Sequence, residues 1–132
     1  MYFAAEVLTP ANTPASAPVV TRLRVYPGVV RQVWLGFPPG CYGLAHIQVW
    51  YCGWQVWPYT PQTSYHWDNY VFAIEDRYPL VEEPLELVLK TWNLDDSYDH
   101  TLTFGCIIDE LVPEDELRSL HESLVALGLL KG

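Results

Sequence analysis

The sequence predicts a mainly β protein: an antiparallel β-sandwich or jelly-roll-like domain with an extended N-terminal arm and a C-terminal α-helix. Apolar and polar residues alternate with a period of two in about six to eight segments, and turn residues separate these segments. No helical pattern lies between the segments, which argues against a parallel α/β sheet. Leucines with helical spacing near the end of the chain predict the helix.

The 132 residues fit one domain, which divides into three regions. Residues 1–18 form the predicted arm, because three prolines keep this region extended and out of a central sheet. Its first part, residues 2–8, also has the composition of a short strand. Residues 19–112 form the predicted sandwich, and residues 113–132 form the helix. A terminal arm of this kind can pair with the sheet edge of a neighbouring molecule.

Each strand of the predicted sandwich comes from one alternating segment. The segments cover residues 19–25, 30–37, 44–51, 70–75, 85–92 and 101–108. Residues 55–57 are expected to extend the third segment beyond a break at Gly53. A loop is expected at residues 58–69 and an acidic turn at residues 93–99, since Pro, Asn, Asp and Ser favour turns.

The predicted helix carries one apolar stripe, formed by Leu117, Leu120, Leu124 and Leu127. Pro113 suits the first helical position, and the three acidic residues after it suit the positive end of the helix dipole. A helix this short is marginal in water, so its stripe needs a partner surface. That surface is either the protein's own domain or another subunit, and the four leucines are therefore interface candidates.

The net charge of −9 is placed unevenly along the chain. Residues 1–74 carry +1, residues 75–99 carry −6 and residues 100–132 carry −4. Nucleic acids and anionic membranes both require several basic side chains on one face, so neither is an expected partner. No apolar run approaches the roughly 20 residues of a membrane-spanning helix, and the first residues lack the basic region of a secretory signal.

The cysteines and histidines predict no metal or other cofactor. Cys41, Cys52 and Cys106 form no C-x-x-C pair, and the four histidines lack the spacing of metal ligands. We expect reduced thiols in a chain made in a reducing cytoplasm. No serine or cysteine lies in a catalytic signature, so the chain is expected not to be an enzyme. A jelly-roll enzyme is kept as an alternative, because its carboxylates can come from distant positions.

Eight tryptophans and tyrosines fall between residues 50 and 70, among them Trp54, Trp57 and Trp67. Such rings fill a sandwich core, anchor a protein interface or stack on sugars. All three roles stay open at this point, and these three tryptophans are the binding candidates.

The acidic turn at residues 93–100 offers several oxygen side chains but lacks the spacing of an EF-hand calcium loop. We expect a turn in which Asx side chains bond their own backbone.

Three stretches carry a resemblance to a known group of proteins. They are FPPGCYGL at residues 37–44, WQVWP at 54–58 and WNLDDSYDH at 92–100, together with NTP at 12–14. Over roughly residues 7–109, the chain resembles small uncharacterised β-sandwich proteins that occur among the structural genes of tailed phages. The resemblance contains no catalytic motif and assigns no residue roles. It implies a virion accessory protein, such as a capsid decoration, cement or vertex protein.

The expected function is therefore that of a non-catalytic structural or assembly protein that binds neighbouring subunits. Its expected partners are copies of itself, capsid subunits or both, and its expected location is the virion, or otherwise the cytoplasm. A carbohydrate-binding module that uses exposed Trp and Tyr is the main alternative, with a glycan as its partner.

Overall fold

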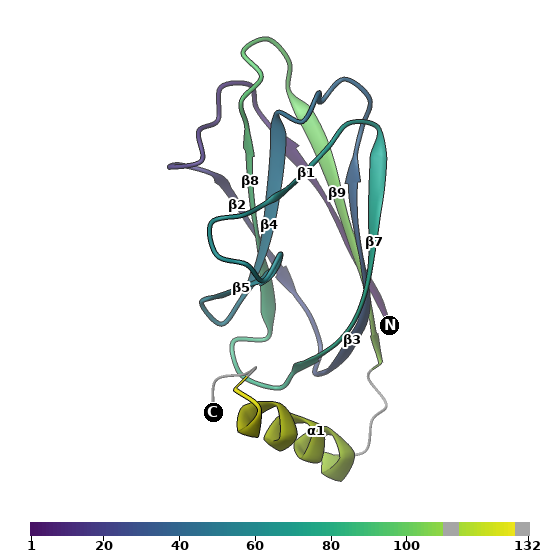
Figure 1. Ribbon diagram of the computed structural model, residues 1–132. Coiled ribbons are helices and arrows are strands. Elements are labelled where there is room, and N and C mark those ends of the chain that lie inside the picture. The colour runs from purple at the N-terminus through teal and green to yellow at the C-terminus, as the bar shows by residue number, and fades with distance from the viewer. Residues whose placement is uncertain (110–113, 129–132) are drawn as a thin grey trace.

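A computed structural model describes residues 1–109 and 114–128, and it confirms the predicted β-sandwich with a C-terminal helix. Two antiparallel sheets pack face to face, and the helix lies across one end of the pair (Figure 1). We call the four-stranded sheet, with strand order β1-β9-β3-β7, sheet A. We call the five-stranded sheet, with order β2-β8-β4-β5 and β6 paired to β4, sheet B.

The strands follow the predicted alternating segments closely. Those of sheet A are β1 (Tyr2–Thr9), β3 (Gly28–Phe37), β7 (Tyr70–Leu80) and β9 (His100–Asp109). Those of sheet B are β2 (Val19–Arg24), β4 (Ala45–Tyr51), β5 (Trp54–Trp57), β6 (Tyr65–His66) and β8 (Glu86–Asn93). β7 runs five residues beyond the predicted end at residue 75, and β6 falls inside the segment predicted as a loop.

The inward side chains of both sheets form one apolar core. In β3 the predicted row of Val33, Leu35 and Phe37 is buried, as expected from the alternation. The predicted row of β9 is buried too: Leu102, Phe104, Cys106 and Ile108. Each large aliphatic side chain buried in this way contributes roughly 1.5–3 kcal/mol, so the sandwich has a substantial core that does not depend on the helix.

The N-terminal region differs from the predicted arm. Residues 2–9 form β1, which pairs along its whole length with β9, so the sandwich begins at Tyr2 and not at residue 19. Phe3, Ala5 and Val7 face the core, and this apolar row gives the strand a reason to dock. The proline-rich part that follows lies outside the sheets, and the Thr13–Asn93 bridge holds it to the last residue of β8.

The sequence predicts β5 as an extension of β4. In the structure, β5 instead turns back and pairs antiparallel with β4. Cys52 and Gly53 form the turn, with φ of 49° and 79°. Positive φ at both central residues is typical of the type I′ hairpin turn, whose twist matches that of the strands. The chain therefore reverses at Gly53, which places Trp54 opposite Tyr51.

Helix α1 (Glu114–Ala126) contacts β7 and packs on its own domain. His121 Nε2 lies 3.3 Å from Glu82 Oε1, which fixes one side of the helix to the sandwich. Leu120 and Leu124 are half-buried, whereas Leu127 is 71% exposed. The side chain of Leu117 lies outside the described residues. Among the described helical residues, no segment is both long and apolar enough to span a membrane.

Candidate functional site

The outer face of sheet A is flat and nearly uncharged. Strand alternation turns outward the side chains opposite to the core rows. Across the sheet they form the rows Tyr2–Ile107–Gln32–Glu75, Ala4–Gly105–Trp34–Ala73, Glu6–Thr103–Gly36–Val71 and Leu8–Thr101. We call these residues the flat face. Its only charged members are Glu6 and Glu75, which lie on the two edge strands, β1 and β7.

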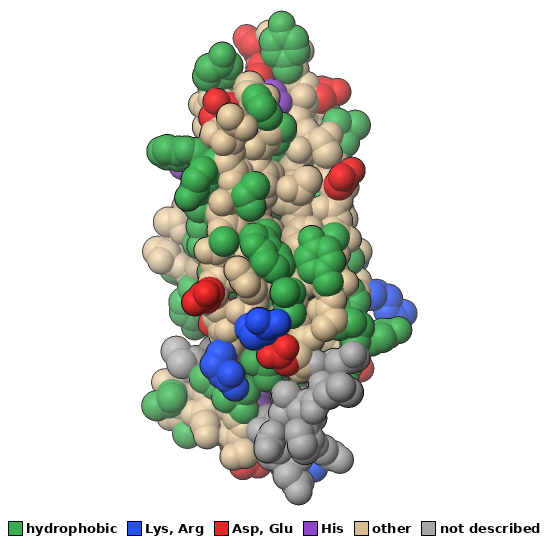
Figure 2. Space-filling model, turned by 90° about the vertical axis from the view of Figure 1, so that its right-hand side faces the viewer, with side chains coloured by type: hydrophobic (Ala, Val, Ile, Leu, Met, Phe, Trp, Pro, Cys, Tyr) green, Lys and Arg blue, Asp and Glu red, His purple; other side chains and the backbone are tan. Residues whose placement is uncertain are grey.

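Several outward positions of the flat face hold glycine or alanine, whose side chains project little from the sheet. The rings of Tyr2 and Trp34 meet edge to face with centroids 5.9 Å apart, and Tyr2 covers Gly105. A β-carbon at Gly105 would come within 2.5 Å of the Tyr2 hydroxyl, so a larger residue here would displace the Tyr2 ring. Figure 2 shows the corresponding side of the molecule, with hydrophobic and uncharged atoms along its middle and charged side chains toward its rims and lower end. The Arg31–Asp109 ion pair lies at the ends of β3 and β9.

Sheet B carries an open groove of about 570 Å³ beside the β4–β5 hairpin. Three aromatic residues line it, Trp50, Trp54 and Tyr59, together with Pro61 and three glutamines, and Trp54 also lines the small pocket beside α1. We call this feature the aromatic groove. Trp54 is 51% exposed and Tyr59 54% exposed, so both rings are open to solvent.

Two glutamines hold the outer wall of the aromatic groove in place. Gln55 Nε2 donates to the carbonyl oxygens of Pro58, Thr60 and Thr63 at 2.8, 3.0 and 3.0 Å. Gln48 Nε2 donates to the carbonyl of Thr63 at 2.8 Å. The loop after β5 is thereby tied to two neighbouring strands, so the groove is preformed.

Two contacts fix Trp50 in the floor of the groove. Its indole Nε1 donates to Gln48 Oε1 at 3.1 Å, and the ammonium of Lys90 lies 3.9 Å from the ring centroid. A cation over a tryptophan face is attracted by the ring quadrupole. Lys90 thus brings a positive charge next to a groove whose lining residues are all uncharged.

Further along sheet B, His46 stacks on Trp92 with centroids 5.1 Å apart and an interplanar angle of 6°. The ring of His66 lies 4.5 Å away on the other side, and His46 Nδ1 is 2.8 Å from Ser64 Oγ. Burial, and then the neighbouring His66, lower the pKa of His46 from 6.5 to about 4. His46 is therefore neutral near pH 7 and joins β6 to β4.

The acidic turn is held by its own side chains, as predicted. Asp95 Oδ1 accepts from the backbone N–H groups of Ser97 and Tyr98 at 2.9 and 3.3 Å. Its Oδ2 lies 2.9 Å from Nε2 of the buried His100. The Ser97 N–H and then the His100 ring lower the pKa of Asp95. These contacts give the carboxylate a structural task.

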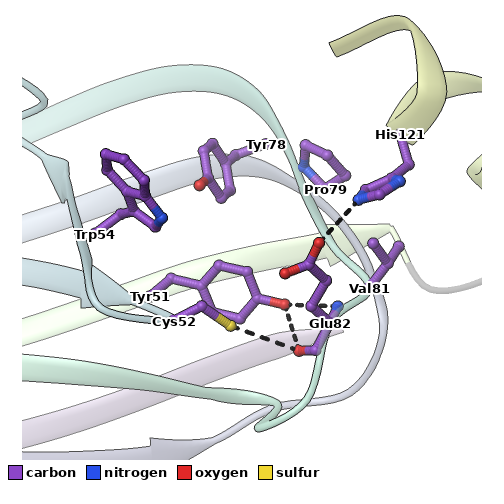
Figure 3. A pocket seen from close by; sticks show the side chains of 8 residues that line it. All are labelled: Tyr51, Cys52, Trp54, Tyr78, Pro79, Val81, Glu82 and His121. Carbon is purple, nitrogen blue, oxygen red and sulfur yellow. Dashed lines mark hydrogen bonds and ion pairs between the residues drawn. The ribbon is translucent and has the colours of Figure 1, made fainter. Parts of the chain in front are cut away.

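A small pocket beneath the helix is also structural. Figure 3 shows Tyr51, Glu82 and His121 joined by hydrogen bonds between β4, the segment after β7 and α1. The Tyr51 hydroxyl donates to the Glu82 carbonyl at 2.6 Å and accepts from the Glu82 N–H at 2.8 Å. Burial raises the pKa of Tyr51. The space of about 10 Å³ holds at most one water molecule, so no ligand fits here.

The three candidate tryptophans lie in different environments. Trp54 lines the aromatic groove, and Trp67 is 57% exposed but does not line it. Trp57 is only 2% exposed, and its indole N–H donates to Asp76 at 3.0 Å, so its prediction as a binding residue is wrong. A register shift between Val49 and Trp50 turns Trp57 toward the core.

Sequence reasoning missed Trp50 and Tyr59 as groove residues. The signal for Trp50 was its alternation with Val49 and Tyr51, which face inward. The flat face was missed as well, although small uncharged residues recur at its outward positions.

In the part of the chain that the structure describes, no three His, Cys, Asp or Glu side chains gather as metal ligands would. Comparison with protein-family models, with curated proteins and with solved structures finds no match to this chain.

Proposed function

We propose that this chain is a non-catalytic assembly protein whose flat face binds the same face of a second copy. The observation that carries the proposal is the near absence of charge on this face in a chain of net charge −9. Exposed apolar side chains on it include Tyr2 at 62%, Leu8 at 59% and Val71 at 55%. Contiguous uncharged patches of this kind are typical of protein interfaces.

The arrangement of the face favours a copy of the same chain as the occupant. Trp34 lies on the inner strand β3 and meets the ring of Tyr2 from the edge strand β1, and aromatic anchors near the centre of an interface contribute most to binding. Glu6 and Glu75 lie at opposite edges, so a two-fold axis through the middle leaves both carboxylates at the rim of the contact. The sheet also packs well against another sheet, because its small residues allow close approach.

The size of the flat face makes the contact weak on its own. Four strands and about seven residues along each give a patch of roughly 20 by 20 Å. Two such patches bury about 800 Å² in total, which is below the usual size of a stable interface. Weak contacts of this size become effective when many act together in a symmetric particle.

The particle that we propose is a virion, with this chain as a capsid decoration, cement or vertex protein. The support is the resemblance of residues 37–44, 54–58 and 92–100 to β-sandwich proteins from phage structural genes. The contacts of three titratable side chains support a non-catalytic role. His46, Asp95 and His100 each form hydrogen bonds that stabilise the fold.

Light scattering over a concentration series tests the assembly role. We expect the mass to rise from 15.1 kDa at micromolar concentration toward twice that value at millimolar concentration. A mass that stays at that of one chain throughout this range would contradict self-association. A low-resolution image of purified virions that carry a labelled copy of the chain tests the location, and a label absent from the particle would contradict it.

A further inference from the structure

We propose that the aromatic groove is a binding site for a neutral carbohydrate chain. This inference goes beyond the assembly role and does not depend on it, because the groove lies on sheet B and the flat face on sheet A. It concerns different residues and a different class of partner.

The groove has the size and rigidity of a ligand site. Its volume of about 570 Å³ lies in the range of roughly 300–1,000 Å³ that small-ligand sites occupy. The Gln55 amide donates to three carbonyl oxygens of the loop. The Gln48 amide also donates to one of these three, that of Thr63. Since these bonds exist before any ligand arrives, binding does not have to order the wall.

The rings of the groove face solvent in a way that core rings do not. Trp54 and Tyr59 are each about half exposed, and the type I′ turn at Gly53 fixes the position of Trp54. Gly53 lines the groove, and nothing lies within 4 Å of a β-carbon placed on it, so there is free space beside this residue. A sugar ring presents a flat C–H face that packs on such aromatic surfaces.

The polar groups favour a sugar over a peptide. A bound peptide needs donors for its backbone carbonyls, but the Trp50 N–H and the Gln55 amide hydrogens are already donated within the protein, and Gln48 Nε2 gives one of its two hydrogens to the Thr63 carbonyl. A hydroxyl can donate as well as accept, so it can also use acceptors. Gln55 and Gln62, which both line the groove, carry amide oxygens that are acceptors of this kind.

The charges favour a neutral sugar. None of the residues that line the groove is acidic or basic. The ammonium of Lys90 lies over the ring of Trp50 and is engaged by it. A neutral ligand therefore buries no charged group that would lack an opposite charge in the groove.

Native gel electrophoresis with soluble polysaccharides tests the proposal. Hydroxyethyl cellulose, xylan, galactomannan and soluble starch are cast separately into gels, and migration of the full chain is compared with a gel that contains no polysaccharide. We expect at least one of the four to retard the wild-type protein. Trp54→Ala should weaken this retention about tenfold or more, equivalent to about 1.4 kcal/mol, and Trp54→Phe should retain part of it.

The matched control is Trp67→Ala, since Trp67 is as exposed as Trp54 but lies outside the groove. It should be retarded like the wild type, and thermal unfolding should show that both alanine variants are folded. The proposal is overturned if no polysaccharide retards the wild type, or if Trp54→Ala and Trp67→Ala behave alike. Binding of a proline-rich peptide without any polysaccharide binding would also overturn it. Val71→Lys on the flat face should retain full sugar binding, so that failure of one proposal is separable from failure of the other.

Discussion

His46 shows how one residue can link the protein's stability to pH. Its ring is enclosed between Trp92 and His66, and its Nδ1 pairs with Ser64. A charged imidazole is costly in this position because the ring is partly removed from water and has another histidine beside it. The neutral form is therefore the one that joins β6 to sheet B.

We predict that the protein loses stability as the pH falls from 6.5 to about 4. The pKa of His46 is 6.5 when unfolded and about 4 when folded, so in this window the unfolded chain binds the extra proton and is favoured. Above pH 6.5 neither state is protonated at this position and the effect is absent. Urea unfolding at pH 8 and pH 4.5 measures the change in the free energy of unfolding.

The control for this prediction is His46→Gln, which keeps a polar group near Ser64 but does not titrate. All other histidines remain in both proteins, so the difference between them isolates His46. The variant should lose less stability between the two pH values. Equal losses would mean that other groups cause the pH dependence.

Individual residues were predictable from sequence only where alternation was regular. Val33, Leu35 and Phe37 were placed in the core correctly because nothing interrupts the period of two between them. Trp57 was misplaced, since the register shift in the β4–β5 pair depends on hydrogen bonds across the hairpin, which residue types alone do not reveal.

At the scale of elements, the β4–β5 hairpin and the loop after it form one unit. Two strands supply the glutamines, and the loop supplies the carbonyl groups that these glutamines bind. The aromatic groove exists because this loop is held away from Trp50 and beside Trp54.

Removal of the Gln55 amide should loosen this unit. Gln55→Ala deletes the donor to three carbonyl groups, and we expect a loss of about 1–2 kcal/mol of stability together with faster proteolysis at residues 58–63. Urea unfolding and limited proteolysis measure both effects. Gln62→Ala is the control, because Gln62 is exposed at the rim and makes no contact of this kind. Equal behaviour of the two variants would show that Gln55 does not hold the loop.

The helix should depend unequally on its leucines. Leu124 is half-buried, whereas Leu127 is 71% exposed. Leu124→Ser should therefore weaken the docking of α1 by about 1 kcal/mol, whereas Leu127→Ser should have almost no effect. Hydrogen exchange of the helix amides measures docking, since an undocked helix of this length is marginal in water. Faster exchange in Leu127→Ser than in Leu124→Ser would contradict this picture of the helix.

The N-terminal region illustrates why element predictions fail. The prolines after residue 9 dominate the local pattern and suggest an arm. β1 is instead held by β9, whose residues lie about 100 positions further along the chain. Such a long-range pairing leaves no local signal except the apolar row of Phe3, Ala5 and Val7.

At the scale of the whole molecule, the two sheets present outer faces of different character. Sheet B carries the Arg22–Glu86 ion pair, Lys90 and the aromatic groove. The outer face of sheet A carries Glu6 and Glu75 on its edge strands and the Arg31–Asp109 ion pair on its inner strands, and its remaining outward rows are uncharged. This difference was not predicted from sequence, because it appears only when outward residues from four distant strands are brought together.

The most direct test of the flat face as the assembly surface is to measure the mass of three proteins by light scattering at millimolar concentration. The three are the wild type, Val71→Lys and Val20→Lys. Val71 is 55% exposed on the flat face, and Val20 is 49% exposed on the outer face of sheet B. A buried, unpaired ammonium at an interface is costly, so Val71→Lys should have the mass of one chain. The wild type and Val20→Lys should both approach the mass of two chains. If all three proteins have the mass of one chain, or if Val20→Lys alone dissociates, the flat face is not the assembly surface.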